Sequence, residues 1–311
     1  MTAAPPFLPV VDIEVHTLAP RSLRLVLRRE SGAQPEDDGA LAPRKPDHLA
    51  GRAQAASGAK TIRSGELVVS VEWKPTRVQI HDRQGRVIQE ITDNPEQRQF
   101  WFALGEGPVF GLGEGGPQFS RRGAVDRMVS GSRGYRLATN GSKVPIQWLM
   151  GGLARGEAWG MFVHQPLGSL DLSGAEGVLN AAASSTVTEV FVAAGTPLAL
   201  MGEYAAITGF PEMPPLWSLG YLQSHRTLGS PEEILAEAAM FREKRLPCDA
   251  MIYLGTGFCP NGWNIANGSF DWNERAFPDP AAALAALHHD HFKVVVHVVL
   301  DGRRLTGTVT D

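Results

Sequence analysis

The chain has 311 residues, of which 43% are apolar and 20% charged, a composition typical of a soluble globular protein with about two domains. Its formal net charge of −4 provides no general field that would attract phosphates, which argues against nucleic acid or a membrane surface as a partner. No segment has the length and apolarity of a membrane span, and no basic segment precedes an apolar run at the start, so we expect a cytoplasmic location. Neither Cys248 nor Cys259 stands in a metal-binding or redox spacing.

Short segments with alternating apolar residues extend from Leu23 to about Val192 and predict antiparallel strands. In ELVVSVEW, residues 67, 69, 71 and 73 share one apolar face, and residues 82–85 separate two further segments as the turn of a hairpin would. Many short strands with turns between them are typical of a β-sandwich, which we assign to residues 1–210.

Residues 31–60 differ from the rest of this first domain. They are rich in Ala, Gly, Pro, Gln and charged residues and show no apolar period. Because such a segment offers little apolar area to offset the entropy of ordering, we expect a flexible surface loop or a disordered insertion.

The period changes from two to helical near residue 196. Thr196 and Pro197 are a plausible N-cap and first helical residue, and Gly209 is a plausible end. The prolines at 211, 214 and 215 then predict a stiff linker, so we place the domain boundary between residues 210 and 211.

Strands and helices alternate over residues 211–311. We predict strands at 217–222, over AMIYL and over FKVVVHVVL, with one helix capped by Ser230 and Glu233 and a second opened by Asp279 and Pro280. Continuous apolar strands separated by helices are typical of a parallel sheet covered on both faces. The chain is therefore expected to be an α+β multi-domain protein, in which a β-sandwich precedes the first about three βα units of a (β/α)8 TIM barrel.

The sequence FGLGEGG, residues 110–116, contains the spacing G-x-G-x-x-G. A dinucleotide site would need a helix directly after the glycines, whereas Pro117 to Ser120 lead into a basic loop, so we reject a nucleotide role. We expect Arg121 and Arg122 in that loop to be solvated charges.

The segment from Gly255 to Phe277 leaves the carboxyl end of a predicted barrel strand, where such barrels carry their active sites. It combines aromatic residues with amides, and that combination suits sugars, whose faces are apolar and whose edges carry hydroxyls. The residues in question are Phe258, Trp263, Phe270 and Trp272, with Asn261, Asn264 and Asn267. Packing of the loop on itself explains the same pattern; it is the favoured interpretation for Phe270 and Trp272 and an equal alternative for Trp263.

Retaining glycosidases need two carboxylates about 5–5.5 Å apart. Asp271, Glu274 and Asp301 fall on the expected face, but they form no convincing pair, so we assign no catalytic residue. The nine histidines show no metal-binding spacing, and we expect no metal site.

Several separate segments in one order resemble glycoside hydrolase family 31, the family of α-glucosidases and related α-glycosidases. They are FGLGE, GEYAAITGFPEMPPLWSLGYLQS, RLPCDAMIYL, and FDWNERAFPDP followed by FKVVVHVVL. The resemblance implies a galactose-mutarotase-like β-sandwich before a (β/α)8 barrel, retaining hydrolysis of an oligosaccharide or α-glycoside substrate, and no cofactor. The catalytic aspartates of that family lie on later barrel strands, beyond Asp311.

The second barrel strand of that family tends to end in carboxylates that hold sugar hydroxyls, where this chain has Leu254, Gly255 and Thr256. We predict that Thr256, Trp263 and Asp301 line the sugar site as contacts rather than catalysts. The alternative hypothesis is a truncated, catalytically inactive module that binds carbohydrate or another partner without turnover.

Overall fold

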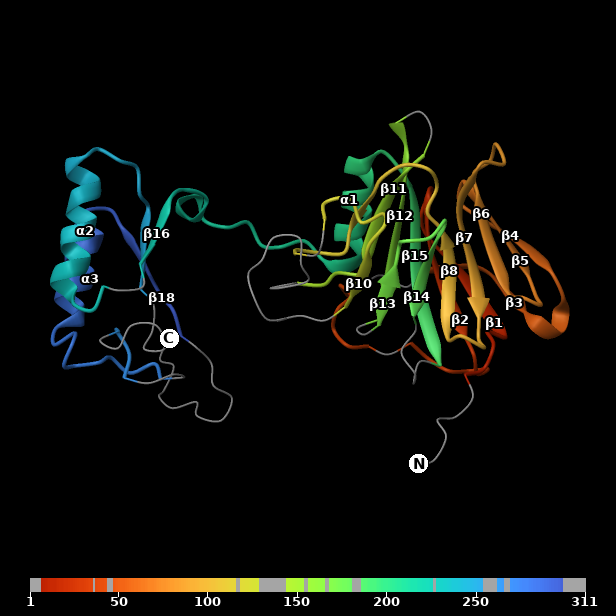
Figure 1. Ribbon diagram of the computed structural model, residues 1–311, viewed down its shortest axis with the longest axis horizontal. Helices are drawn as coiled ribbons and strands as arrows, with labels where there is room; N and C mark the ends of the chain where they lie inside the picture. The colour runs from red at the N-terminus through yellow and green to blue at the C-terminus, as the bar shows by residue number, and fades with distance from the viewer. Residues whose placement is uncertain are drawn as a thin grey trace, which may run out of the picture. The chain divides into compact units, whose positions relative to one another are not determined.

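A computed structural model describes residues 7–35, 37–43, 47–115, 118–128, 144–153, 156–165, 168–180, 186–225, 228–253, 262–265 and 269–298. The chain divides into two compact units, residues 1–210 and 211–311, and each has hydrophobic cores of its own. Strands make up most of the first unit, whereas the second combines strands with helices (Figure 1). No described helix is both long and apolar enough to cross a membrane.

The first sheet of residues 1–210 has seven strands, and every neighbouring pair in it is antiparallel. Helix α1 (Pro197–Thr208) comes directly after the last strand of this sheet in the chain. It packs on one face of the sheet through Leu200 and Ile207. Thr196 caps it by accepting a hydrogen bond from the Ala199 amide at 3.3 Å, as predicted. The strand order is β3 (His48–Gln54), β1 (Asp12–Ala19), β2 (Ser22–Arg28), β15 (Val187–Gly195), β12 (Ala158–His164), β11 (Trp148–Gly152) and β9 (Val109–Gly111).

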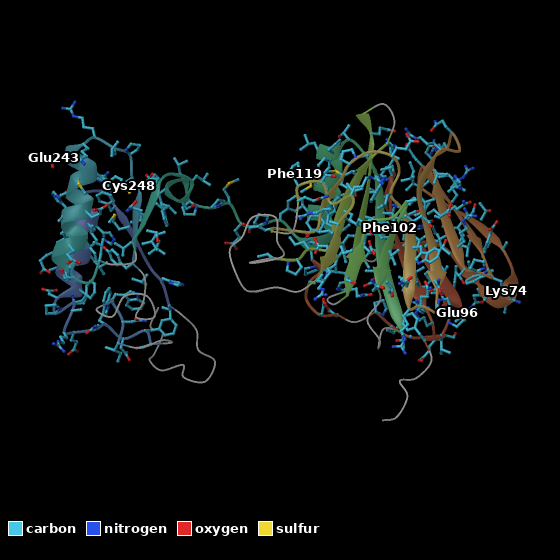
Figure 2. All side chains as sticks on the ribbon, viewed as in Figure 1. Lys74, Glu96, Phe102, Phe119, Glu243 and Cys248 are labelled. Atoms are coloured by element: carbon cyan, nitrogen blue, oxygen red, sulfur yellow. The ribbon has the colours of Figure 1, made fainter. Side chains whose placement is uncertain are left out.

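The second sheet has eight strands and is also antiparallel throughout. One hydrophobic core joins the two sheets, with Ile13 and Leu25 from the first and Ile80 and Phe102 from the second; Figure 2 shows Phe102 inside the unit. The order is β10 (Val125–Arg127), β13 (Ser169–Asp171), β14 (Glu176–Asn180), β8 (Gln99–Ala103), β7 (Val87–Asn94), β6 (Arg77–His81), β5 (Leu67–Glu72) and β4 (Lys60–Ser64).

The alternation read from the sequence predicts the inner face of this sheet correctly. Leu67, Val69 and Val71 of β5 are at most 1% exposed, whereas the residues between them are half-buried. The predicted hairpin is present between β6 and β7, and its turn is fixed by Asp82, whose Oδ1 accepts hydrogen bonds from the amides of Gln84 and Arg86.

The expectation of a loop or disordered insertion over residues 31–60 is wrong for its second half. Residues 48–54 form β3 and residues 60–64 form β4, with a single 3-10 turn, Ala55–Ser57, between them. Each is the edge strand of its sheet, and Ala53 is the only buried residue of β3. Backbone pairing rather than apolar burial holds β3 in place, so its sequence carries no apolar period.

A chain of charged groups lies on the face of the first sheet that carries α1. His164 Nδ1 is 2.9 Å from one oxygen of Glu189, and Arg24 donates to the other oxygen at 2.7 Å. His164 Nε2 in turn lies 3.0 Å from Asp38, and Arg24 lies 2.9 Å from Asp47. Asp38 and Asp47 belong to the segment expected to be a loop, so these ion pairs tie it to the sheet.

The second unit alternates strands and helices along the chain. Its three strands form a parallel sheet in the order β16-β17-β18, with Ser224, Ile252 and Val295 side by side in the register. The elements are a 3-10 helix (Leu216–Leu219), β16 (Leu222–His225), α2 (Pro231–Glu243), β17 (Ala250–Tyr253), α3 (Pro280–His289) and β18 (Lys293–Val296).

The predicted helix starts of this unit are confirmed. Ser230 accepts a hydrogen bond from the Glu233 amide at 3.3 Å, and Asp279 accepts one from the Ala282 amide at 2.9 Å. Each cap is followed by a proline at the first helical position, where no amide donor is needed.

The strand expected at residues 217–222 begins later than predicted. Pro215 precedes a 3-10 helix over Leu216–Leu219, and the strand itself spans Leu222–His225. Trp217 and Leu219 belong to the 3-10 helix instead, and Leu219 is exposed, so an apolar run there did not mean burial in a sheet.

Candidate functional site

The candidate site is the carboxyl edge of the parallel sheet, where the chain leaves β17 and β18. The strands are in register, so their ends meet at one edge, and the amide of His297 donates to the carbonyl of Tyr253 at 2.9 Å. The segment after β17 carries the aromatic and amide residues identified in the sequence. Its residues 262–265 and 269–277 are described, and they fold back towards β18.

Trp263 is built into the hydrophobic core of the second unit. Its side chain is 3% exposed, and its ring lies edge-on to Trp272 with the centroids 5.4 Å apart. The indole N–H donates to the carbonyl of His297, just beyond β18, at 3.2 Å. The residue therefore attaches the loop to the sheet edge, and in this conformation its ring is covered by protein.

The amide of Asn264 also serves the loop itself. Asn264 is 1% exposed, and its Nδ2 donates to the carbonyl of Ser269 at 3.2 Å. Asn261 and Asn267, which the sequence suggested alongside it, lie outside the described residues. The amide that could contact a sugar hydroxyl is therefore not Asn264 in this conformation.

Asn273 is the residue that the sequence reasoning missed. Its Nδ2 donates to the carbonyl of Gly262 at 3.1 Å, its Oδ1 accepts from the Ala276 amide at 3.4 Å, and its own amide donates to the carbonyl of Trp263 at 2.7 Å. The sequence did contain a signal for this role, because an Asn side chain commonly bonds to backbone groups a few residues away in a turn. Asn273 holds the two described parts of the loop together.

Of the other aromatic residues in the loop, Trp272 and Phe277 serve as packing, whereas Phe258 lies outside the described residues. Trp272 contacts the core between Trp263 and Phe277, whose ring centroid lies 5.7 Å from its own. Phe277 is 2% exposed, whereas Phe270 is 37% exposed. The favoured packing interpretation therefore fits Trp272, and Phe270 presents more of its ring to solvent.

The two acidic side chains described at this edge, Asp271 and Glu274, are exposed and separate. Asp271 interacts with the hydroxyl of Ser269 at 3.4 Å, and Glu274 is exposed in the turn that follows. Asp249 lies at the opposite end of β17, where its backbone bonds to Tyr221 and Lys293. Within the described residues, no three His, Cys, Asp or Glu side chains form a group that could hold a metal ion.

Two of the three predicted sugar contacts, Thr256 and Asp301, lie outside the described residues. The same holds for Leu254 and Gly255, which stand where carboxylates are expected from the family resemblance. Their contribution to the site stays a prediction. Trp263 is the one predicted contact with a described position.

The glycine-rich segment in the first unit is a tight turn rather than a phosphate loop. No helix begins within the described residues that follow it, 118–128. Gly111 has φ 118°, and a Cβ there would lie 2.1 Å from the carbonyl oxygen of Trp148; Gly113 has φ 77°, and its Cβ would lie 2.0 Å from that of Val144. The glycines are needed for this close approach of two backbones.

The expectation that Arg121 and Arg122 are solvated charges is wrong. Arg121 is 6% exposed, and its guanidinium donates to the carbonyls of Gly111, Gly113 and Gly115 at 3.0, 3.2 and 2.5 Å. Burial lowers the pKa of Arg121. Arg122 bonds in the same way to the carbonyls of residues 104, 105 and 107. A guanidinium has five N–H donors in one plane, which suits a turn that exposes several carbonyls. No sequence pattern indicates that an arginine is used in this way.

Comparison with known proteins supports the family that the sequence segments of the first section resemble. The family described as "Glycosyl hydrolases family 31 TIM-barrel domain" matches residues 211–302. Alpha-glucosidase 2 of Bacillus thermoamyloliquefaciens is 25% identical over 253 residues, which are 76% of this chain and 30% of the relative. An alpha-xylosidase of Saccharolobus solfataricus is 25% identical over 210 residues, 67% of this chain and 27% of the relative.

Solved structures share the fold of most of the chain. A family 31 dextranase of Flavobacterium johnsoniae complexed with glucose aligns with a TM-score of 0.69 at 19% identity, over 91% of this chain and 35% of the dextranase. A family 31 alpha-xylosidase from a soil metagenome, complexed with xylose, aligns with a TM-score of 0.72 at 16% identity, over 96% of this chain and 48% of the xylosidase.

These similarities show that the chain resembles glycoside hydrolases of family 31, and its described structure consists mainly of β-strands. The resemblance to glycoside hydrolase family 31 is confirmed, and residues 211–302 match the model of that family's TIM-barrel domain. The chain spans 30% and 27% of the length of these two curated relatives.

Proposed function

We propose that the chain is part of an α-glucosidase-type enzyme that hydrolyses α-linked sugars with retention of configuration. In this proposal residues 211–311 supply the first three βα units of a (β/α)8 barrel. The observation that carries it is the parallel order β16-β17-β18 with α2 and α3 in the connections, over the residues matched by the family's TIM-barrel sequence. Parallel strands joined through helices are the repeating unit of that barrel.

The two faces of the parallel sheet support the same proposal. Met251 and Tyr253 point to the core formed with α2 and α3, whereas Ile252 and Val295, on the other face, are half-buried. In a closed barrel the face opposite the helices is filled by layers of branched apolar side chains from alternate strands. Ile252 and Val295 have the residue types used in such layers, and because they lie on neighbouring strands they would belong to two different layers.

Retaining hydrolysis requires a carboxylate nucleophile and a carboxyl acid about 5–5.5 Å apart. Asp271 and Glu274, the acidic residues described at the carboxyl edge, are exposed and show no contact with each other. We place the catalytic pair on later strands of the full enzyme, as the family resemblance implies. The 311-residue chain by itself is then expected to bind sugar weakly at most at the carboxyl edge of the parallel sheet, and to hydrolyse none.

Thr256, Trp263 and Asp301 remain our proposed sugar contacts. Thr256 and Asp301 follow β17 and β18 at the edge where barrel enzymes bind substrate. Trp263 is 3% exposed, so a contact between its ring and a sugar requires the loop to change conformation. Leu254, Gly255 and Thr256 offer one hydroxyl and no carboxylate, so the innermost sugar would be held mainly by groups other than carboxylates from this strand.

The proposal is tested by comparing this chain with one extended through the rest of an eight-stranded barrel. We expect no release of nitrophenol from aryl α-glucosides or α-xylosides by the 311-residue chain, and turnover by the extended chain. The first product anomer, followed by NMR, should keep the α configuration. Turnover by the short chain would contradict our placement of the catalytic pair, and an inactive eight-stranded chain would favour a non-catalytic carbohydrate-binding module.

A further inference from the structure

A cavity of about 510 Å³ lies in the first unit, at one end of the eight-stranded sheet. It is formed by the turn between β5 and β6, the hairpin between β7 and β8, and residues 9–11. Small-molecule sites commonly occupy about 300–1,000 Å³. The cavity has that size and belongs to a different unit from the candidate site at the parallel sheet.

Two tryptophans line this cavity and are held in place by their own hydrogen bonds. The indole N–H of Trp73 donates to the carbonyl of Gly58 at 2.8 Å, and that of Trp101 donates to Gln99 Oε1 at 2.9 Å. Both rings are half-buried. The ring of Trp73 also packs against the hydrophobic core. Because the indole donors are already engaged, a ligand in the cavity would meet the carbon surface of the rings rather than their N–H groups.

The position of Trp101 follows from the pleat of β8. Phe100 and Phe102 are 3% and 2% exposed and point to the core, so Trp101 between them lies on the outer face of the sheet. Its register partner on β7 is Thr92, which also lines the cavity. An aromatic surface therefore stands next to a hydroxyl group.

The wall of the cavity is fixed by buried polar contacts. The amide of Val10 donates to Asp93 at 2.9 Å, and Thr76 Oγ1 donates to the carbonyl of Val10 at 3.3 Å. Asp93 also accepts from Arg29 at 2.8 Å, and both side chains are buried. The cavity is therefore preformed, which lowers the entropic cost of binding.

The rim carries groups of both charges. Lys74 and Glu96 are exposed and line the cavity, and Figure 2 shows both at the lower right of the first unit. Neither makes an ion pair with another described residue. A donor and an acceptor are thus available at the rim. The charges of Lys74 and Glu96 are opposite and Asp93 is paired with Arg29, so the cavity has no net charge that would select an ionic ligand.

We propose that this cavity binds a neutral oligosaccharide of hexopyranose units. Hexopyranoses have an apolar face, which suits the carbon surfaces of Trp73 and Trp101, and hydroxyl edges, which suit Thr92, Lys74 and Glu96. The saccharide class follows from the cavity; only the choice of α-linked probes below depends on the proposed function. Such a site would hold a substrate chain on the first unit without taking part in hydrolysis.

The test is titration of the 311-residue chain with maltohexaose and isomaltohexaose, followed by calorimetry and by tryptophan fluorescence. We expect measurable binding that Trp73→Ala and Trp101→Ala each weaken about tenfold or more. Phe119→Ala is the matched control, because Phe119 is an 86% exposed aromatic of the same unit that does not line the cavity. Its affinity should equal that of the unchanged chain.

A second variant keeps the test decisive if a tryptophan variant fails to fold. Lys74→Gln combined with Glu96→Gln alters only the exposed rim, so the melting temperature should stay unchanged while affinity falls about threefold or more. The proposal would be overturned if the unchanged chain bound neither oligosaccharide. It would also be overturned if the rim variant and both folded tryptophan variants bound as tightly as the unchanged chain. The readout is binding and not turnover, so an inactive enzyme would refute the proposed function while leaving this result intact.

Discussion

His164 and Glu189 form a 2.9 Å contact across β12 and β15, and Arg24 binds the second oxygen of the same carboxylate. The hydrogen bond to Glu189 raises the pKa of His164 above its ordinary 6.5, against the effect of burial. Burial acts to raise the pKa of Glu189, but the hydrogen bond from His164 and the charge of Arg24 outweigh it and hold that pKa below 4.5. The two groups are therefore most strongly paired when both are charged.

This pairing predicts a window of pH in which it stabilises the first unit. The His164 contribution is complete below pH 6.5 and is lost as the pH rises through its raised pKa, whereas that of Glu189 is complete above pH 4.5 and is lost as the pH falls through its lowered pKa. The free energy of unfolding lost in His164→Gln should therefore be largest between about pH 4.5 and 6.5. Urea unfolding at pH 5.5 and pH 8.5 measures it, and an equal loss at both would refute the pairing.

Trp263→Ala should destabilise the second unit by about 3–5 kcal/mol, because it leaves a cavity beside Trp272 and removes the hydrogen bond to His297. Hydrogen exchange of the β17 and β18 amides should accelerate, while that of the first unit stays unchanged. Phe270→Ala, at a residue 37% exposed in the same loop, should cost less than about 1 kcal/mol. Lost sugar binding by Trp263→Ala at full stability would instead show that the ring is a direct contact.

Gly177→Ala should destabilise the first unit by about 1–3 kcal/mol through overpacking. Gly177 of β14 pairs with Phe102 of β8, and a Cβ on Gly177 would lie 2.3 Å from the Phe102 ring. Gly152→Ala is the matched control, because no atom lies within 4 Å of a Cβ at that strand position. Thermal unfolding of the two variants separates the steric effect from the loss of a glycine; equal midpoints would argue against the clash.

Arg121→Ala should cost about 3 kcal/mol or more, since it leaves the carbonyls of Gly111, Gly113 and Gly115 without the guanidinium that they contact. Arg122→Ala removes a similar set of bonds at a more exposed position, where water replaces the donors, and should cost less. Chemical denaturation of both variants provides the comparison. A smaller loss for Arg121→Ala than for Arg122→Ala would contradict this difference in burial.

Sequence patterns predicted those elements whose residues report directly on burial or on backbone donors. The alternation of Leu67, Val69 and Val71 identified an inward strand face, and Ser230 and Asp279 identified helix starts, because each pattern is caused by the structure it predicts. Strand β3 was missed because an edge strand held by backbone pairing imposes little on its side chains. Arg121 was predicted wrongly because nothing in the local sequence distinguishes a solvated arginine from one that is buried and bonded to backbone carbonyls.

The course of the loop after β17 was predicted better than the contacts of its side chains. The loop after β17 was identified from its place in the chain, and its aromatic residues lie at the expected edge. Whether Trp263 faces a ligand or the core depends on long-range contacts with Trp272 and the His297 carbonyl, which no local pattern contains. Asn273 could have been found, because its relation to Ala276 is local.

The passage from β3 to β4 takes the chain from the rim of one sheet to the rim of the other within residues 55–59. This short covalent connection joins the two sheets along one side, so they cannot separate there unless β3 or β4 unfolds. The two edge strands carry Arg52, Lys60 and Arg63. These cations disfavour the addition of a strand from a neighbouring molecule. A protease cut within residues 55–59 should therefore loosen the two sheets along this edge.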